Sequence, residues 1–225
     1  MAAFPFAIVG FDLDGTLLDT SADLAGAVNH ALDLAGRPPL DMATVMTTVG
    51  RGAKHMLEQA LEASGGYDDA LMARVYPPLL DHYRDHVSDH SRPFPGMLDA
   101  LDALAARGAT LGIVTNKFEY LAVKLIAELG LDHRFAAIIG GDTMGKGNAK
   151  PSALPIREMI RRCGGGRTAF VGDSIYDTMA ARNAEVPSVA VRFGFLSQPV
   201  EELGADAVID SYAELVPVLE RLGTS

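Results

Sequence analysis

Short, continuous apolar runs separated by helical patterns constrain the fold of this chain more than any other feature. The expected strands are residues 6–11, 109–114, 136–139, 168–172, 187–191 and 207–209. Because these runs are apolar throughout, they are typical of a parallel sheet covered by helices on both faces. The helical patterns between them, such as residues 118–130, end at a glycine, the usual C-terminal stop. The alternation predicts an α/β fold with a doubly wound, mostly parallel sheet.

Residues 20–89 break this alternation, because they have helical patterns and no strand pattern. We expect an all-helical cap subdomain at 20–89, inserted into an α/β core made of residues 1–19 and 90–225. Thr20 and Asp23 are spaced as a helix-capping pair. Pro77 and Pro78 are expected to kink or restart the last helix of the insert.

Composition and charge limit which binding partners and which cellular compartment are expected for this protein. The chain has 225 residues and a formal net charge of −10, so a broad basic surface for nucleic acid or an anionic membrane is not expected. The N-terminal segment lacks the basic region of a signal peptide, and no apolar run is long enough to span a membrane. Cys163 is the single cysteine, which excludes an intramolecular disulfide and favours a reducing compartment. We therefore predict a cytoplasmic protein, either a monomer or a homodimer.

Two acids follow the first strand directly, in the sequence Asp12-Leu13-Asp14. Like charges this close destabilise a site unless a cation or a reaction needs them. The carboxyl ends of parallel strands meet at one edge of the sheet, where ligands of such folds bind. Polar residues that are expected at the same edge are Thr115, Asn116, Lys150, Asp173 and Asp177.

This set of side chains predicts a phosphoryl-transfer site with a metal ion. Carboxylate oxygens are the ligands that Mg²⁺ prefers, together with water and phosphate oxygens. A hydroxyl group and an ammonium group can hold the remaining oxygens of a phosphoryl group. The expected partner is a small phosphorylated metabolite.

Three simpler interpretations remain open at this stage. Asp173 could be only the N-cap of the next helix. The segment 140–147 nearly matches a phosphate-binding loop, but Gly147 stands where Ser or Thr is needed, which favours a plain turn and leaves Lys146 as an alternative to Lys150. The spacing of His82, His86 and His90 favours a solvated helix face over a zinc site.

Four motifs occur in the order that is typical of the haloacid dehalogenase superfamily: DLDGT (12–16), Thr115 after the second core strand, Lys150-Pro151, and GDSIYD (172–177). The chain resembles this superfamily from Phe6 to about Gly194. The resemblance implies that Asp12 is a nucleophile that forms an aspartyl-phosphate, and that Asp14 is the general acid and base. It implies Mg²⁺ between Asp12, the Asp14 carbonyl and Asp173. The residues implied in phosphate binding or in support of the site are Thr115, Asn116, Lys150, Thr16, Ser174 and Asp177. Because halide leaves unprotonated, an acid at Asp14 favours a phosphatase over a dehalogenase.

In the insert, Arg51 lies between two glycines and Lys54 begins a helical pattern. Free N–H groups and two cations would suit a second anionic group such as a carboxylate, although an ordinary turn explains the same residues. Five segments together resemble the bacterial phosphoglycolate phosphatases: VGRGA (49–53), FPG (94–96), VTNK (114–117), GGDT (140–143) and GDSIYD (172–177). The resemblance implies hydrolysis of 2-phosphoglycolate. Phosphatases of sugar phosphates or pyrophosphate and β-phosphoglucomutase-like phosphomutases remain alternatives. A non-catalytic binding or regulatory protein on the same fold is a remote one.

Overall fold

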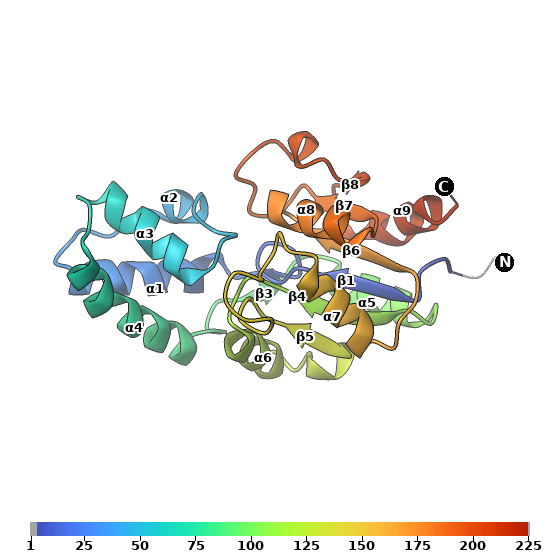
Figure 1. Cartoon of the computed structure of the whole chain (residues 1–225), viewed down its shortest axis with the longest axis horizontal. Helices are drawn as coiled ribbons and strands as arrows, with labels where there is room; N and C mark the ends of the chain where they lie inside the picture. The colour runs from blue at the N-terminus through green and yellow to red at the C-terminus, as the bar shows by residue number, and fades with distance from the viewer. Residues whose placement is uncertain (1–3, 225) are drawn as a thin grey trace. The chain divides into compact units, whose positions relative to one another are not determined.

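The computed structural model describes residues 4–224, which form two compact units (Figure 1). The first unit runs through Asp19 and resumes at Pro93, and the second is Thr20–Arg92. The sequence predicted a return to the first unit at residue 90, whereas the structure has it at Pro93. The reason is that the N–H groups of His90 and Ser91 donate to the Asp23 carboxylate of the second unit, which keeps these residues with the helices.

The first unit is built on a six-stranded sheet in the order β5-β4-β1-β6-β7-β8. Every strand pair of this sheet is parallel, and β1 lies in the middle between β4 and β6. The predicted doubly wound parallel sheet is therefore confirmed. The strands are β1 (Ile8–Phe11), β4 (Thr110–Val114), β5 (Ala137–Ile139), β6 (Thr168–Gly172), β7 (Ser188–Val191) and β8 (Ala207–Ile209).

Helices cover both faces of this sheet. On one face α7 and α8 pack against each other, and on the other α5 packs against α9. Met159 of α7 lies so close to Gly10 and Gly112 that an added Cβ at either glycine would come within 2.7 Å of its side chain. Each large apolar side chain buried in this core contributes roughly 1.5–3 kcal/mol. The helices are α5 (Met97–Ala105), α6 (Glu119–Glu128), α7 (Leu154–Arg162), α8 (Ile175–Ala184) and α9 (Leu215–Leu222).

The chain leaves and re-enters the first unit at neighbouring points. Two-residue strands mark these points, β2 (Leu18–Asp19) and β3 (Arg92–Pro93). The Phe94 N–H donates to the Leu17 carbonyl at 3.1 Å, which ties the two crossings together within the first unit. Three short 3₁₀ helices complete this unit, η1 (Asp132–Arg134), η2 (Val200–Leu203) and η3 (Tyr212–Glu214).

The second unit is helical. It contains α1 (Ser21–Leu34), α2 (Met42–Met46), α3 (Ala53–Ala63) and α4 (Asp69–Asp85). Its core lies mainly between α1 and α4 and includes the buried residues Val28, Val75 and Leu79.

Two sequence expectations about the second unit were wrong: a restart of its last helix at the prolines, and a capping pair at the start of its first helix. Pro77 and Pro78 lie inside α4, which does not restart there. Thr20 is the N-cap residue of α1, but its side chain makes no capping hydrogen bond. Asp23 does not complete a capping pair, because its carboxylate accepts hydrogen bonds from the main chain of His90 and Ser91 and from the Ser91 hydroxyl. These partners are distant in sequence, so local spacing could not indicate them.

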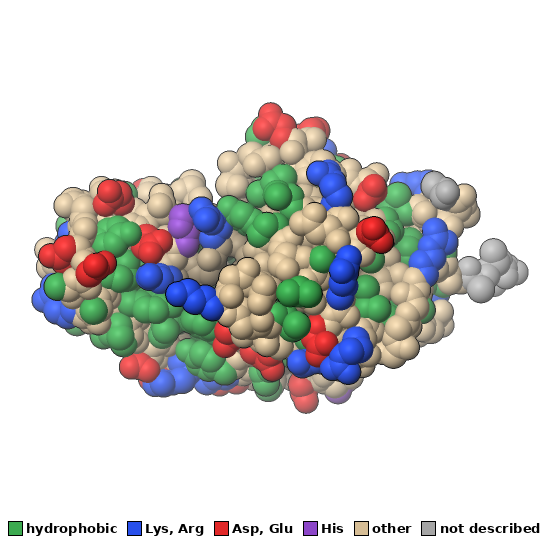
Figure 2. All heavy atoms as spheres, in the orientation of Figure 1, with side chains coloured by type: hydrophobic (Ala, Val, Ile, Leu, Met, Phe, Trp, Pro, Cys, Tyr) green, Lys and Arg blue, Asp and Glu red, His purple; other side chains and the backbone are tan. Residues whose placement is uncertain are grey.

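Among residues 4–224, no helix is both long enough and apolar enough to cross a membrane. On the face of the molecule in Figure 2, basic side chains lie singly or in small groups among acidic and apolar ones. This mixture agrees with the formal net charge of −10.

Candidate active site

The site begins where β1 ends. The Asp12 N–H donates to the Val171 carbonyl of β6 at 2.9 Å, so the sheet ladder continues to the first acid of the pair. The chain then turns at Gly15, whose φ of 81° lies in the left-handed region that favours glycine. Asp12 is 8% exposed. The turn therefore keeps one carboxylate buried at the carboxyl edge of the sheet.

Three carboxylates gather at this edge. Asp12, Asp173 and Asp177 are all buried, and each offers an oxygen within 4.8 Å of those of the other two. The Oδ1 atom of Asp12 is buried and accepts no regular hydrogen bond from the described residues. A buried carboxylate oxygen of this kind, beside two other carboxylates, fits the hard oxygen ligation of Mg²⁺.

Lys150 supplies the positive charge beside these acids. Its Nζ donates to Asp177 Oδ1 at 2.6 Å and lies 2.7 Å from Asp12 Oδ1, an ion-pair distance without hydrogen-bond geometry. Its side chain is 2% exposed, whereas Lys146 is exposed. Lys150, and not Lys146, is therefore the lysine that reaches the acids.

Burial dominates the electrostatics of the site. It raises the pKa of Asp12 to about 7, opposed by Lys150 and assisted by Asp177 and Asp14. Burial also raises the pKa of Asp173 well above its ordinary value, with Asp12 and Asp177 adding to the shift. Burial alone would lower the pKa of Lys150, but the Asp12 and Asp177 carboxylates raise it above its ordinary value. Crowded buried carboxylates of this kind need a compensating cation to be fully ionised.

The comparisons with known proteins decide the family. A sequence model of the haloacid dehalogenase-like hydrolases matches residues 9–191. The chain belongs to the haloacid dehalogenase-like hydrolase family. The resemblance expected from the four motifs is thus confirmed.

Curated relatives cover almost the whole chain. The chain is 44% identical to a phosphoglycolate phosphatase of Agrobacterium fabrum, over 96% of this chain and 92% of that protein. It is 40% identical to a phosphoglycolate phosphatase of Caulobacter vibrioides, over 97% and 93%. A crystal structure described as a predicted phosphoglycolate phosphatase, from Haemophilus somnus, matches with a TM-score of 0.88 at 28% identity, over 95% and 98%. These alignments therefore include both the core segments and the inserted helices.

The structure of this hydrolase corrects the capping interpretation of Asp173. The N-cap of α8 is Ser174, which forms a reciprocal capping box with Asp177. The Asp177 carboxylate accepts from the Ser174 N–H and hydroxyl with one oxygen and from Lys150 with the other. Asp173 is therefore left to face the site, and Asp177 joins the helix start to the lysine.

Thr115 and Asn116 follow β4 at the same edge. Thr115 is buried, its N–H donates to the Ile139 carbonyl, and its hydroxyl accepts from the Lys117 N–H at 3.2 Å. The Asn116 side-chain amide donates to the Lys150 carbonyl at 3.3 Å, which links the loops after β4 and β5.

Sequence reasoning missed Lys117. Its Nζ donates to both carboxylate oxygens of Asp14, at 2.6 and 2.8 Å, and its side chain is 3% exposed. The available signal was its position two residues after Thr115, in a loop at the same sheet edge. The site of this hydrolase therefore contains two lysines that pair with aspartates, and the sequence indicated only Lys150.

The glycine-rich segment 140–147 is a series of turns between β5 and α7, and no helix follows it directly. A phosphate-binding loop needs a helix start immediately after it. The structure thus agrees with the plain-turn interpretation.

Arg51 and Lys54 lie in the second unit, where both are exposed. Gly52 is the N-cap of α3 and has a φ of 85°. Lys54 Nζ lies 3.8 Å from Glu58 on the same helix. A role for either cation in binding substrate stays a prediction.

The histidines of the second unit form a cluster that includes one residue the sequence did not indicate. The His82 ring stacks on His30 of α1, with centroids 4.4 Å apart, and lies 4.5 Å from the His86 ring. His86 Nδ1 lies 2.7 Å from Asp89. Among the described residues, the carboxylate cluster alone has the ligand spacing for a metal ion, so the histidine stack is not such a site as it stands.

Proposed function

We propose that the chain is an Mg²⁺-dependent phosphatase that hydrolyses 2-phosphoglycolate to glycolate and phosphate. The observation that carries the proposal is the gathering of Asp12, Lys150 and Asp173 at the carboxyl edge of the sheet. The substrate comes from the names of the relatives that match over nearly the full chain. A bound divalent cation would neutralise charge on the phosphate and on the crowded carboxylates.

Asp12 is the proposed nucleophile. One of its carboxylate oxygens attacks phosphorus, and the bond between phosphorus and the glycolate oxygen breaks. Asp14 gives a proton to that leaving oxygen, so glycolate departs and an aspartyl-phosphate remains. A water molecule then attacks phosphorus and gives its proton to Asp14, which releases phosphate and restores Asp12.

The remaining residues hold these groups in place. The Lys150 ammonium, which Asp177 fixes from its other side, would neutralise the phosphoryl oxygens next to Asp12. The Thr115 hydroxyl and the Asn116 amide would bind the same group. Lys117 would hold the Asp14 carboxylate in one orientation, because it contacts both oxygens. Asp12 and Asp173 would bind the cation, with the Asp14 carbonyl as a further ligand.

The second unit is proposed as the cap that covers this site and excludes water. The proposed domains are therefore a catalytic core at 1–19 and 93–225 and a cap at 20–92, which moves the predicted return to the core from residue 90 to Pro93. Arg51 and Lys54 are the proposed partners of the substrate carboxylate.

The test is a comparison of kcat/KM with Mg²⁺ for 2-phosphoglycolate, a hexose phosphate and pyrophosphate. We expect 2-phosphoglycolate to exceed the others by at least about tenfold, because it alone offers one phosphate and one carboxylate at short separation. Asp12→Asn keeps the side-chain shape and should lower turnover by about a thousandfold or more. Preference for another substrate would contradict the substrate proposed, and an active Asp12→Asn variant would contradict the nucleophile.

A further inference from the structure

The loop after β7, residues 192–195, lies outside the four motifs but contacts a predicted metal ligand. The Phe195 main-chain N–H donates to Asp173 Oδ2 at 2.6 Å. The other carboxylate oxygen lies 3.5 Å from the Thr16 hydroxyl, a much weaker contact. The stronger of these two contacts on Asp173 therefore comes from a backbone group that sequence analysis could not assign.

Two glycines show how closely this loop is packed against the site. An added Cβ at Gly15 would lie 2.1 Å from Asp173 Oδ2 and 2.8 Å from the Phe195 ring. An added Cβ at Gly194 would lie 2.3 Å from the Asp173 Cβ and 2.6 Å from the Gly15 carbonyl oxygen. The turn after β1, the end of β6 and the loop after β7 thus meet without room for a methyl group.

Aromatic side chains pack around the loop after β7. The Phe193 ring lies 5.0 Å from Phe94 and 5.3 Å from Tyr212, and Phe94 lies 6.4 Å from Phe195. The buried Tyr212 hydroxyl donates to the Thr16 carbonyl at 2.8 Å. These contacts anchor the loop to the same turn that carries Asp12 and Asp14.

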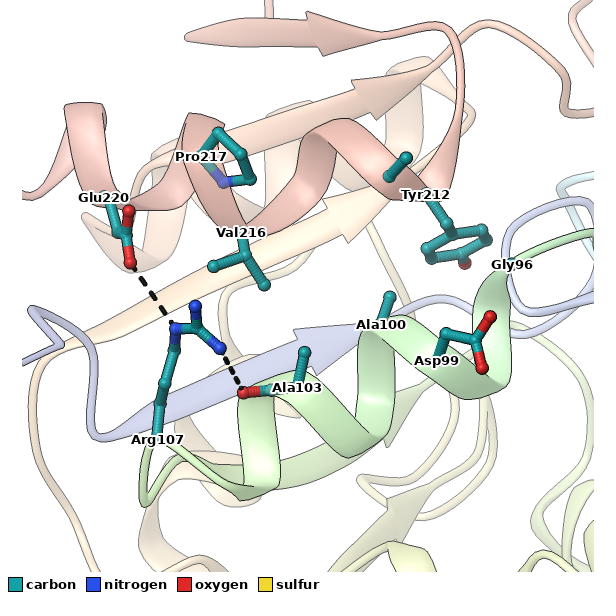
Figure 3. A pocket seen from close by; sticks show the side chains of 10 residues that line it. Gly96, Asp99, Ala100, Ala103, Arg107, Tyr212, Val216, Pro217 and Glu220 are labelled. Atoms are coloured by element: carbon teal, nitrogen blue, oxygen red, sulfur yellow. Dashed lines mark hydrogen bonds and ion pairs between the residues drawn. The ribbon is translucent and has the colours of Figure 1, made fainter.

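Tyr212 is held in turn between two helices of the first unit. A groove of about 360 Å³ runs between α5 and α9, with Tyr212 and Gly96 at one end and the Arg107–Glu220 ion pair at the other (Figure 3). A Cβ added at Gly96, the N-cap residue of α5, would lie 3.5 Å from the Tyr212 Cβ, an ordinary van der Waals contact. Tyr212, which anchors the loop, therefore packs directly against the start of α5.

We propose that the Phe195 main-chain N–H is a positioning group that orients the Asp173 carboxylate for a divalent cation. One oxygen is fixed by the N–H, so the carboxylate plane is set and the group can face the cation together with Asp12. The alternative is that the loop only fills space, in which case the aromatic ring and not the N–H would matter. This inference rests on the metal site of the proposed function, since it requires a cation at Asp173, and does not depend on the substrate.

The test separates the N–H from the ring. Phe195→Pro removes both, whereas Phe195→Leu removes the ring and keeps the N–H. Glu185 is the only non-glycine residue with positive φ in the described chain, so Phe195 does not have the positive φ that would exclude proline outright. Mn²⁺ binding is measured by isothermal titration calorimetry without substrate, and folding of each variant is checked by its melting temperature in EDTA.

We expect Phe195→Leu to bind Mn²⁺ within about threefold of the wild type and Phe195→Pro to bind about ten- to a hundredfold more weakly, the usual effect of losing a hydrogen bond to a charged group. Equal Kd values in the wild type and both variants, or equal losses in both variants, would overturn the inference. If the proline variant does not fold, phenyllactate incorporated at position 195 replaces only the N–H by an ester oxygen and gives the same comparison.

A control separates this inference from the proposed function. Asp173→Asn should lose Mn²⁺ binding if Asp173 is a ligand. A wild-type protein that binds Mn²⁺ but hydrolyses no phosphate ester would contradict the proposed function and leave the positioning role intact. A wild-type protein that binds no Mn²⁺ would overturn both.

Discussion

Lys117 Nζ contacts both carboxylate oxygens of Asp14, from a side chain that is almost completely buried. Asp14 follows the end of β1 and Lys117 follows the end of β4, and these two strands are parallel neighbours in the sheet. A two-oxygen contact fixes the carboxylate more firmly than a single one, because it restricts rotation about the terminal bond. In the proposed mechanism, Lys117 would therefore set the position from which Asp14 delivers or accepts a proton.

The first prediction concerns Lys117→Met, which keeps the length of the side chain and removes its charge. Loss of a hydrogen bond to a charged group costs about 1.5–3 kcal/mol, so kcat/KM for 2-phosphoglycolate should fall about ten- to a hundredfold. Nitrophenyl phosphate should lose much less, since nitrophenolate leaves without a proton. Lys146→Met, at an exposed lysine, is the matched control. Equal losses for both substrates would show that Lys117 does not act through Asp14.

The second prediction concerns the stability of the metal-free protein. Burial raises the folded-state pKa of Asp12 to about 7, above its unfolded value of 3.8, so the folded state binds more protons between these values. Stability from this group is complete at low pH and is lost as pH rises through 7. Asp12→Asn should therefore raise the melting temperature in EDTA at pH 8, by about 5 °C, and have little effect at pH 4. The exposed Asp132→Asn is the control, and a shift that does not depend on pH would contradict the assignment.

The third prediction concerns metal dependence. EDTA should abolish activity and Mg²⁺ should restore it, whereas Ca²⁺ should inhibit because its larger and looser ligand shell misplaces the nucleophile. Since burial raises the pKa of both Asp12 and Asp173, a cation must displace protons from them. Mg²⁺ affinity should therefore increase from pH 5.5 to pH 8, with proton release measurable by calorimetry in two buffers of different ionisation enthalpy. Full activity in EDTA would exclude the proposed metal site.

The fourth prediction concerns the two basic side chains at the start of α3, Arg51 and Lys54. If Arg51 binds the substrate carboxylate, Arg51→Ala should lower kcat/KM for 2-phosphoglycolate about ten- to a hundredfold and leave kcat/KM for an aryl phosphate without a carboxylate nearly unchanged. Lys54→Ala should have the same selectivity with a smaller effect, because an ammonium group is a less directional partner than a guanidinium. Parallel losses for the two substrates would instead indicate a role in folding or closure.

The fifth prediction concerns the histidine stack. Burial lowers the pKa of His82, the neighbouring His30 and His86 lower it further, and Asp85 and Asp89 oppose the shift. The folded state then binds fewer protons than the unfolded state below pH 6.5, so the stability of the second unit should fall as pH decreases from 7 to 5. His82→Gln should flatten this dependence, as measured by thermal unfolding, whereas the exposed His133→Gln should not. Identical pH profiles for the wild type and His82→Gln would contradict the prediction.

The features that sequence reasoning predicted are those that depend on strand ends. Continuous apolar runs indicated all six strands of the main sheet, and the meeting of parallel strand ends brought Asp12 and Asp173 together. These inferences need only the direction of each strand and the place where it stops. Lys150 lies farther from its strand and was preferred over Lys146 because Pro151 follows it.

The features that it missed depend on side-chain reach or on the packing of distant segments. The Lys117 ammonium reaches Asp14 only through a particular set of side-chain angles, and His30 meets His82 only because α1 packs on α4. The Phe195 N–H belongs to the backbone, so its residue type gives no signal. Asp23 was assigned to a local cap because its true partners lie near residue 90.

The hydrogen bond between the Phe94 N–H and the Leu17 carbonyl determines how the inserted helices could be removed or replaced by engineering. The chain leaves the first unit at β2 and returns at β3, and these two points lie side by side. For the first unit the inserted helices are therefore equivalent to one closed loop, and the entropic cost of closing a loop changes only slowly with its length. A short turn that joins these two positions should leave the sheet order intact, and so should a foreign helical insert. In the proposed function, the first unit would thus be a constant reaction centre and the inserted helices a replaceable module that determines selectivity.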